Sequence, residues 1–416
     1  MPHNSHMDRS LGPLLEKLHF SEASPKMAFI VGPRQCGKTY LARMLQSRRG
    51  SPGLYRNWDD LGFRREISRS PYGFLDEYRP SGPRPLAVLD EIHKFPKWKT
   101  YLKGLWDTRA DRADVLVTGS GRLDVYQRGG DSMLGRYHAY RLHPLSLSEL
   151  CGRSFDPDQD TPPAILDRLM AGTPAVLAEE REGFDRLMRF GGFPEPFLGQ
   201  SERKHRLWLR ERRERLVRED LRDLTRVHLL SSVEQMMELL PLRAGSRLSM
   251  NSLREDLGVS LESVRLWMDQ FERLYICHRV RPYAGRLQRS LRREPKLFLH
   301  DWSEAGDPGA RFENMLACAL LRWCHFTQDW GQEELGLHYV RDKEKREVDF
   351  LLTLGKKPWL LIEAKLSGAA PSNHLGYFAS RLPGVRTLLV CAEAPAPGSA
   401  GGVRVLPAAT FLSHIP

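Results

Sequence analysis

A glycine-rich octapeptide near the amino terminus has the composition of a phosphate-binding loop. Residues 32–39 read Gly-Pro-Arg-Gln-Cys-Gly-Lys-Thr, which fits the pattern G-x-x-x-x-G-K-[ST]. An apolar, strand-like run at 26–31 precedes the loop, and helical periodicity follows it. A strand, a loop and a helix in this order direct backbone N–H groups at a polyphosphate. We expect the Lys38 ammonium at the β- and γ-phosphates and the Thr39 hydroxyl on Mg²⁺. The predicted nucleotide-binding residues are Gly32, Pro33, Arg34, Gln35, Cys36, Gly37, Lys38, Thr39 and Tyr40.

Two adjacent carboxylates follow a second apolar segment. Residues 86–89 are apolar and typical of a buried parallel strand, and the chain then reads Asp90-Glu91. Open α/β sheets bind ligands at the carboxyl ends of their strands. We therefore expect Asp90 to help hold Mg²⁺ and Glu91 to orient the attacking water, because metal neutralisation and water activation are separate tasks in phosphoryl transfer. The alternative is that the pair only caps the next helix.

Two further strand-like segments complete this region. The first, 114–120, is apolar and ends in Thr118 and Ser120. In nucleoside triphosphatases a polar residue at this place can contact the γ-phosphate or the attacking water, and Ser120 is the candidate. The second begins at Leu134 and continues into Tyr-Arg-Leu-His-Pro-Leu-Ser-Leu-Ser-Glu-Leu at 140–150.

Residues 8–200 resemble the AAA+ ATPases, in particular a bacterial and archaeal branch with the signature Y-x-L-x-P-L-S-x-x-E-L, which residues 140–150 match. The resemblance continues into Gly-Gly-Phe-Pro-Glu at 191–195, which is typical of the lid. It implies ATP and Mg²⁺ as cofactors and ATP hydrolysis as the activity. In clamp-loader relatives an arginine at the start of the last strand enters the neighbouring subunit's site, and Arg136 occupies that place. The alternative is a surface arginine paired with a carboxylate.

Composition limits the class of protein. The 416 residues suffice for two or three domains, and no apolar run approaches the length of a membrane span. Residues 1–7 resemble an expression-tag remnant. The six cysteines lack C-x-x-C or zinc-type spacing and there is no secretory signal, so we expect a cytoplasmic protein without membrane partners. A net charge of +11 and a pI near 9.4 favour a polyanionic partner.

The basic charge is concentrated in the middle of the chain. Residues 203–226 contain ten Lys/Arg against five acids, and residues 279–296 contain seven against one. The first run predicts either a solvated helix or a track for a phosphate backbone. Two short helices at 249–258 and 260–274 and a strand at 275–282 follow the order of a winged helix. The predicted nucleic-acid contacts are Arg265, Gln270, Arg286 and Arg289, and the alternative is a lid and subunit contact.

Four charged residues near the carboxyl terminus have the types of a metal-dependent nuclease site. Glu313 lies on an apolar-periodic helix, Asp349 on a strand, and Glu363 and Lys365 on one face of a further strand. Residues 305–416 thereby resemble the PD-(D/E)xK nuclease superfamily, with an α-β-β-β-α-β core. Asp349 and Glu363 would share one or two Mg²⁺ or Mn²⁺ ions, Glu313 would complete the metal ligands, and Lys365 would orient or deprotonate the attacking water.

The predicted fold class is α/β. We expect a tag remnant (1–7), a P-loop AAA+ core with a parallel sheet (8–150), a helical lid and basic linker (151–243), a winged helix (244–300) and a PD-(D/E)xK nuclease-like domain (301–416). The whole resembles AAA ATPases fused to a domain of unknown function. The function predicted is ATP hydrolysis coupled to DNA remodelling or cleavage by a homo-oligomer, with a ring as one form. The alternatives are an ATP-dependent oligomerisation switch and a DNA-binding scaffold with an inactive nuclease-like domain.

Overall fold

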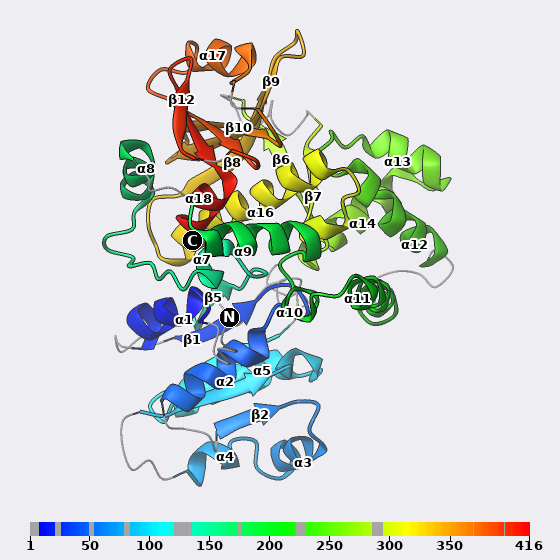
Figure 1. Cartoon of the computed structure of the whole chain (residues 1–416). Helices are drawn as coiled ribbons and strands as arrows, with labels where there is room; N and C mark the ends of the chain where they lie inside the picture. The colour runs from blue at the N-terminus through cyan, green and yellow to red at the C-terminus, as the bar shows by residue number, and fades with distance from the viewer. Residues whose placement is uncertain are drawn as a thin grey trace. The chain divides into compact units, whose positions relative to one another are not determined.

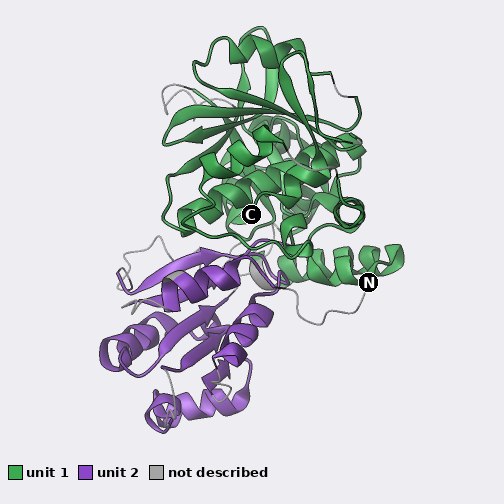
Figure 2. Ribbon diagram, turned by 60° about the vertical axis from the view of Figure 1, so that its left-hand side comes forward, with its two compact units in different colours: residues 1–7, 145–416 green, residues 8–144 purple. Residues whose placement is uncertain are grey.

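The computed structural model describes residues 8–20, 26–49, 54–78, 84–119, 133, 135–172, 176–221, 230–284, 294–368, 370–394 and 396–416. The predictions for residues 1–7, Ser120, Arg286 and Arg289 lie outside these ranges. Two compact units are present, residues 8–144 and residues 145–416 (Figure 2). We call them the amino-terminal unit and the carboxyl-terminal unit.

The amino-terminal unit is built on a parallel sheet with the strand order β2-β3-β4-β1-β5 (Figure 1). Its strands are β1 (Met27–Val31), β2 (Tyr55–Asn57), β3 (Leu86–Asp90), β4 (Asp114–Thr118) and β5 (Tyr137–Arg141). Every residue of β1 and β3 is buried, which explains why both appear in the sequence as continuous apolar runs. The segments predicted as strands correspond to β1, β3, β4 and β5, whereas the three-residue β2 was not predicted.

Helices supply the crossovers that parallel strands require. They are α2 (Lys38–Arg48), α3 (Leu61–Arg69), α4 (Gly73–Asp76), η3 (Ile92–Lys94) and α5 (Trp98–Arg109). Two further helices, α1 (Leu11–Leu14) and η1 (Leu15–Phe20), precede β1. Phe29, Leu89 and Val117 from three strands pack with Trp98 and Leu102 of α5 in one core. Because all five strands run in the same direction, the loop after β1 and Asp90 at the end of β3 emerge at the same edge of the sheet.

The carboxyl-terminal unit contains a mixed sheet with the order β12-β13-β11-β10-β9-β8-β6-β7. Its strands are β6 (Cys277–Pro282), β7 (Lys296–Leu299), β8 (Leu335–Arg341), β9 (Glu347–Leu354), β10 (Lys357–Lys365), β11 (Arg386–Cys391), β12 (Gly398–Ala400) and β13 (Val403–Pro407). Its helices are α7 (Leu147–Leu150), α8 (Pro162–Ala171), α9 (Ala178–Phe190), α10 (Pro194–Gly199), α11 (Glu202–Arg215), η5 (Leu216–Leu221), α12 (Leu230–Leu239), η8 (Pro241–Arg243), α13 (Met250–Leu257), α14 (Leu261–Arg273), η9 (Trp302–Glu304), α16 (Pro308–Asp329), α17 (Asn373–Ala379) and α18 (Ala408–Ser413).

Both faces of this sheet are covered. Phe350 and Ile362 face a core formed with the long helix α16, whereas their neighbours Leu351 and Leu361 face a second core formed with α17 (Figure 1). Strand alternation therefore buries successive residues on opposite sides. The element order α16-β8-β9-β10-α17-β11 follows the predicted α-β-β-β-α-β pattern. The mixed sheet is consistent with a nuclease-like fold, which stays a prediction.

The predicted helix–turn–helix at 249–274 corresponds to α13 and α14. Ser249 and Ser260 are their N-caps, and α13 ends at Gly258 with φ +63°, as a left-handed C-cap requires. The hairpin β6–β7 follows, and the end of β6 pairs in parallel with β8. The predicted domain boundary at 300 thus falls within one continuous sheet. No helix in the described part of the chain combines the length and apolarity of a membrane crossing.

Candidate functional site

The loop between β1 and α2 has a backbone that only glycine fits at two positions. Gly32 has φ +146°, and a Cβ added there would lie 2.2 Å from the carbonyl oxygen of Leu142. Gly37, the N-cap of α2, has φ +100°. The helix begins at Lys38, so the amide groups of its first turn face the concave side of the loop.

The side chains of the loop take different positions. The Lys38 Nζ donates hydrogen bonds to the carbonyl oxygens of Gly32 (3.0 Å) and Pro33 (2.6 Å), and the side chain is buried against the loop. Cys36 is buried, Arg34 and Gln35 are half-buried, and Tyr40 in the first turn of α2 is 40% exposed. The sequence-predicted loop residues therefore lie together at the carboxyl edge of the sheet.

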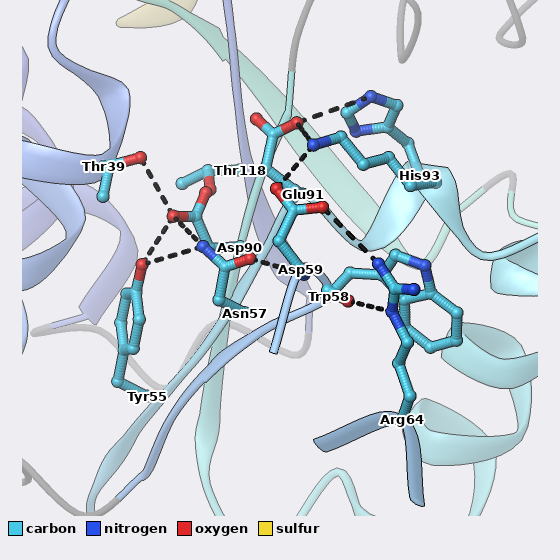
Figure 3. Close-up of polar contacts among 11 residues, drawn as sticks. Thr39, Tyr55, Asn57, Trp58, Asp59, Arg64, Asp90, Glu91, His93 and Thr118 are labelled. Carbon is cyan, nitrogen blue, oxygen red and sulfur yellow. Dashed lines mark hydrogen bonds and ion pairs between the residues drawn. The ribbon is translucent and has the colours of Figure 1, made fainter. Parts of the chain in front are cut away.

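Asp90 is the centre of a hydrogen-bond network at this edge (Figure 3). Its Oδ2 accepts hydrogen bonds from Thr39 Oγ1 (2.9 Å), Tyr55 Oη (2.6 Å) and Asn57 Nδ2 (3.3 Å), and its Oδ1 accepts one from Thr118 Oγ1. The side chain is only 1% exposed. Burial and the hydrogen bond to Asp90 raise the pKa of Tyr55. The four donors are neutral groups.

Glu91 is held in a left-handed conformation, with φ +56°. Its Oε2 lies 3.3 Å from Lys94 Nζ and 3.8 Å from His93 Nε2, and Lys94 also donates to Asp59 at 2.6 Å (Figure 3). Burial alone would lower the pKa of Lys94, but the hydrogen bond to Asp59 and the charge of Glu91 outweigh it and raise that pKa. Glu91 stands at the N-cap position of η3, but its side chain accepts no capping hydrogen bond from that helix.

Arg9 is a loop-supporting residue that the sequence pattern did not indicate. Its Nη1 donates to the carbonyl oxygen of Cys36 at 2.6 Å, and its Nη2 donates to the carbonyl oxygen of His143. The side chain is 2% exposed. One guanidinium thereby joins the phosphate loop to the segment that follows β5. The contacts span 27 and 134 residues, so no local signal predicts them.

Arg136 lies at the start of β5, as predicted, and forms a two-pronged pair with Asp107. The Nε–Oδ1 distance is 2.7 Å and the Nη2–Oδ2 distance is 3.1 Å. The hydrogen bond to Asp107 raises the pKa of Arg136. This is the surface pairing that was the alternative to a role in a neighbouring subunit. At the end of β4 the structure describes Thr118, whose hydroxyl donates a hydrogen bond to Asp90. Ser120 lies outside the described residues.

Two of the three acidic residues predicted as metal ligands in the carboxyl-terminal unit, Glu313 and Asp349, lie around a lysine together with Glu347. Lys296 Nζ lies 2.9 Å from Glu313 Oε1, 2.8 Å from Glu347 Oε1 and 3.6 Å from Asp349 Oδ1. Burial lowers the pKa of Lys296, but its three carboxylates reverse this and raise it. Burial raises the pKa of Glu313 to about 7 and also raises that of Asp349. Neither Lys296 nor Glu347 was predicted as part of this site.

Glu363 and Lys365 lie on β10 as predicted, but their contacts are with the protein. Glu363 Oε2 accepts a hydrogen bond from the Ser372 backbone N–H at 2.8 Å, and Lys365 donates to the carbonyl oxygen of Ala370. The Lys365–Glu363 distance is 3.9 Å. Among the residues that the structure describes, no three His, Cys, Asp or Glu side chains are arranged to hold a metal ion. These contacts do not fit the predicted metal set.

A pocket of about 450 Å³ lies between α13, α14 and the β6–β7 hairpin. Its charged lining residues are Arg265, Arg279, Arg281, Asp269 and Glu294. Arg265 is exposed, as a nucleic-acid contact requires. Gln270 is buried with Trp267 and Phe271 on the core side of α14, so its burial corrects the prediction that it contacts nucleic acid. Helical periodicity explains this, since positions 267, 270 and 271 share one face.

Three segments of the chain match known protein families. Residues 24–151 match the family described as AAA domain, residues 181–305 match a domain of unknown function (DUF8612), and residues 308–411 match another (DUF4143). Residues 24–151 are thus an AAA-type ATPase domain, and the match supports ATPase activity and the use of a nucleotide. The descriptions of the other two families name no function. No curated protein matches the sequence.

Several solved structures are similar to the chain. The Aeropyrum pernix Orc1 protein in complex with DNA is 17% identical, with a TM-score of 0.31 over 76% of this chain and 94% of that chain. The Thermotoga maritima RuvB Holliday junction branch migration motor is 15% identical, with a TM-score of 0.28 over 65% and 87%. The Bacillus subtilis DNA clamp loader delta protein is 10% identical, with a TM-score of 0.26 over 64% and 88%.

The contacts of Arg9 lead to a prediction about the loop. Arg9→Ala removes two hydrogen bonds from a charged donor, each worth about 1.5–3 kcal/mol, and leaves two loop-supporting carbonyls without that donor. We expect a rise of about tenfold or more in the Kd for ATP, measured by titration calorimetry. Arg48→Ala is the matched control, because its pairs with Asp8 and Glu16 are exposed and contribute little. Equal affinities for Arg9→Ala and wild type would exclude this role.

Proposed function

We propose that this chain is an ATP-hydrolysing AAA+ protein that binds DNA through its carboxyl-terminal unit and acts as a homo-oligomer. The observation that supports hydrolysis is the convergence of the loop at 32–39 with Asp90 and Glu91 at one edge of the parallel sheet. A cradle of N–H groups, an ammonium, a hydroxyl and two carboxylates are the components that phosphoryl transfer needs. No binding of DNA or of other subunits follows from this edge alone.

The residues of this edge divide the chemistry among them. The loop amides and Lys38 bind the triphosphate, and Thr39 with Asp90 would hold Mg²⁺, which neutralises phosphate charge when bound. The hydrogen bond from Thr39 to Asp90 and the neutral surroundings of Asp90 fit a cation at this place. Glu91 orients the attacking water and accepts its proton.

Two substitutions separate binding from hydrolysis. Lys38→Ala removes the ammonium that contacts the phosphates, so tight ATP binding should be lost. Glu91→Gln keeps the shape but removes the base, so ATP should bind normally while turnover falls about 100-fold or more. Nucleotide titration and phosphate release on the same preparations provide the measurement. Normal turnover by Glu91→Gln, or micromolar ATP affinity in Lys38→Ala, would remove the respective residue from its role.

We propose further that Arg136 acts in the site of a neighbouring copy. It lies at the start of β5, the place that the AAA+ resemblance indicates, and its guanidinium is at the protein surface beside the equally accessible Asp107. Exposed ion pairs are worth little, so Arg136 can leave Asp107 at small cost when subunits assemble.

Mixing variants tests this arrangement. Arg136→Ala should bind ATP and hydrolyse it about 1000-fold more slowly, because an arginine finger contributes several powers of ten to the rate. Addition of Lys38→Ala subunits, which keep Arg136, should restore part of the turnover. Asp107→Ala is the control, since it breaks the pair but keeps the finger. Full activity of Arg136→Ala alone would exclude the role.

The pocket beside α14 supports DNA binding. Asp269 pairs with Arg279 at 2.7 Å, although Arg279 also pairs with Glu272, and Glu294 pairs with Arg247 at 3.4 Å. Three arginines against two acids give the lining a net positive charge. Arg265 and Arg281 make no ion pair with any residue in the described ranges. The pocket is therefore positive, and guanidinium groups bind phosphate oxygens well. We propose that it holds the phosphate backbone, whereas recognition of bases is left open.

Substitution of the pocket arginines tests the DNA proposal. Arg265→Ala with Arg281→Ala should weaken binding to duplex DNA at least tenfold and reduce the salt dependence of binding, because fewer phosphates are neutralised. Arg254→Ala on α13 is the control, since it removes one charge outside the pocket. Fluorescence anisotropy at several salt concentrations gives both quantities. If ATP turnover rises with DNA, a motor is favoured, whereas an unchanged rate favours the oligomerisation switch.

A further inference from the structure

The acidic cluster of the carboxyl-terminal unit carries its own cation. Lys296 on β7 is 3% exposed, and its Nζ is surrounded by Glu313 from α16 and by Glu347 and Asp349 from β9. The Tyr339 ring, 5.8 Å away, adds a further favourable contact for the ammonium. Two of the three N···O distances are those of charge-assisted hydrogen bonds. The nitrogen thus lies where the carboxylates converge.

Electrostatics decides between this ammonium and a metal ion. Three carboxylates at one place repel one another and require a positive charge. A magnesium ion would have to approach the same oxygens to about 2.1 Å, which places two cations within a few ångströms of each other. The repulsion between them in a buried site is large. The cluster therefore accommodates the ammonium or a divalent ion, but not both.

Two further oxygens of the predicted metal set also accept hydrogen bonds from the protein. Asp349 Oδ2 accepts a hydrogen bond from the Ala364 backbone N–H at 2.9 Å, and Glu363 Oε2 accepts one from Ser372 N–H. Glu347 is bound on its other oxygen by Arg341 Nη1 at 2.7 Å. Glu347 and Asp349 thus each have a donor from the protein on the oxygen that the ammonium leaves open.

We infer that Lys296 takes the place of a divalent metal, so that the nuclease-like sheet carries a permanent ion cluster and does not hydrolyse nucleic acid through a metal at this site. The ammonium joins β7 of the hairpin to α16 and β9, which fixes the arginine pocket on the sheet. This inference is independent of the nucleotide site, and it favours a domain that holds DNA over one that cuts it.

Removal of the lysine charge tests the inference. Nucleotide-free wild type and Asp349→Asn are titrated with Mn²⁺ in a calorimeter. The two proteins should give the same binding heat, because Lys296 already fills the wild-type cluster. Lys296→Met leaves three carboxylates without a cation, so its melting temperature should fall and should then rise with millimolar Mn²⁺. Lys365→Met is the matched control, since its ammonium lies outside the cluster, and its melting temperature should not respond to Mn²⁺.

Three results would overturn the inference. The first is a wild-type Mn²⁺ site that is lost in Asp349→Asn. The second is Mn²⁺-dependent cutting of a plasmid by wild type that Glu363→Ala abolishes. The third is a folded Lys296→Met that binds no Mn²⁺. If Lys296→Met does not fold, the wild-type titration and the plasmid assay decide alone. ATP turnover, measured in parallel, shows whether the nucleotide site functions and is independent of these outcomes.

Discussion

A single buried carboxylate, Asp90, holds the amino-terminal site together. It accepts hydrogen bonds from Thr39 at the start of α2, from Tyr55 and Asn57 on β2, and from Thr118 at the end of β4. Burial of a charge costs free energy unless hydrogen bonds or an opposite charge compensate it. Because these donors are neutral, they fix the carboxylate without cancelling its charge. The same interaction sets the position of the loop and leaves a negative site for a cation.

The carboxyl-terminal unit compensates its buried carboxylates with an opposite charge and not with neutral donors. There the buried acids are compensated by the ammonium of Lys296, which belongs to the chain and cannot be exchanged. A divalent metal can enter with its substrate and activate a bound water, whereas the Lys296 ammonium is held by carboxylates of the core and stabilises the fold. The acidic pair Asp90-Glu91 therefore suits an exchangeable cation, whereas the acidic residues around Lys296 already have a cation from the protein.

The sequence predicted the parts of the site that are local. The loop at 32–39 and the pair Asp90-Glu91 are contiguous in the chain, and their neighbouring strands are apolar enough to recognise. Tyr55 and Asn57 lie on a strand of three residues, which is too short to show alternation. Arg9 reaches the loop only through tertiary packing. The side chain of Gln270 follows the helical period into the core, which a reading of residue types alone did not take into account.

Lys296 shows why a count of charges along the sequence was insufficient. It belongs to the basic run 279–296, which contains seven Lys/Arg against one acid. In the hairpin, Lys296 pairs with Val280, and directly opposed residues of antiparallel strands share one face. Arg279 and Arg281 flank Val280 and so face the other side, where the pocket lies. Strand alternation thus places the members of one basic run on two faces. Arg279 and Arg281 line the pocket, whereas Lys296 pairs with acidic residues of the core.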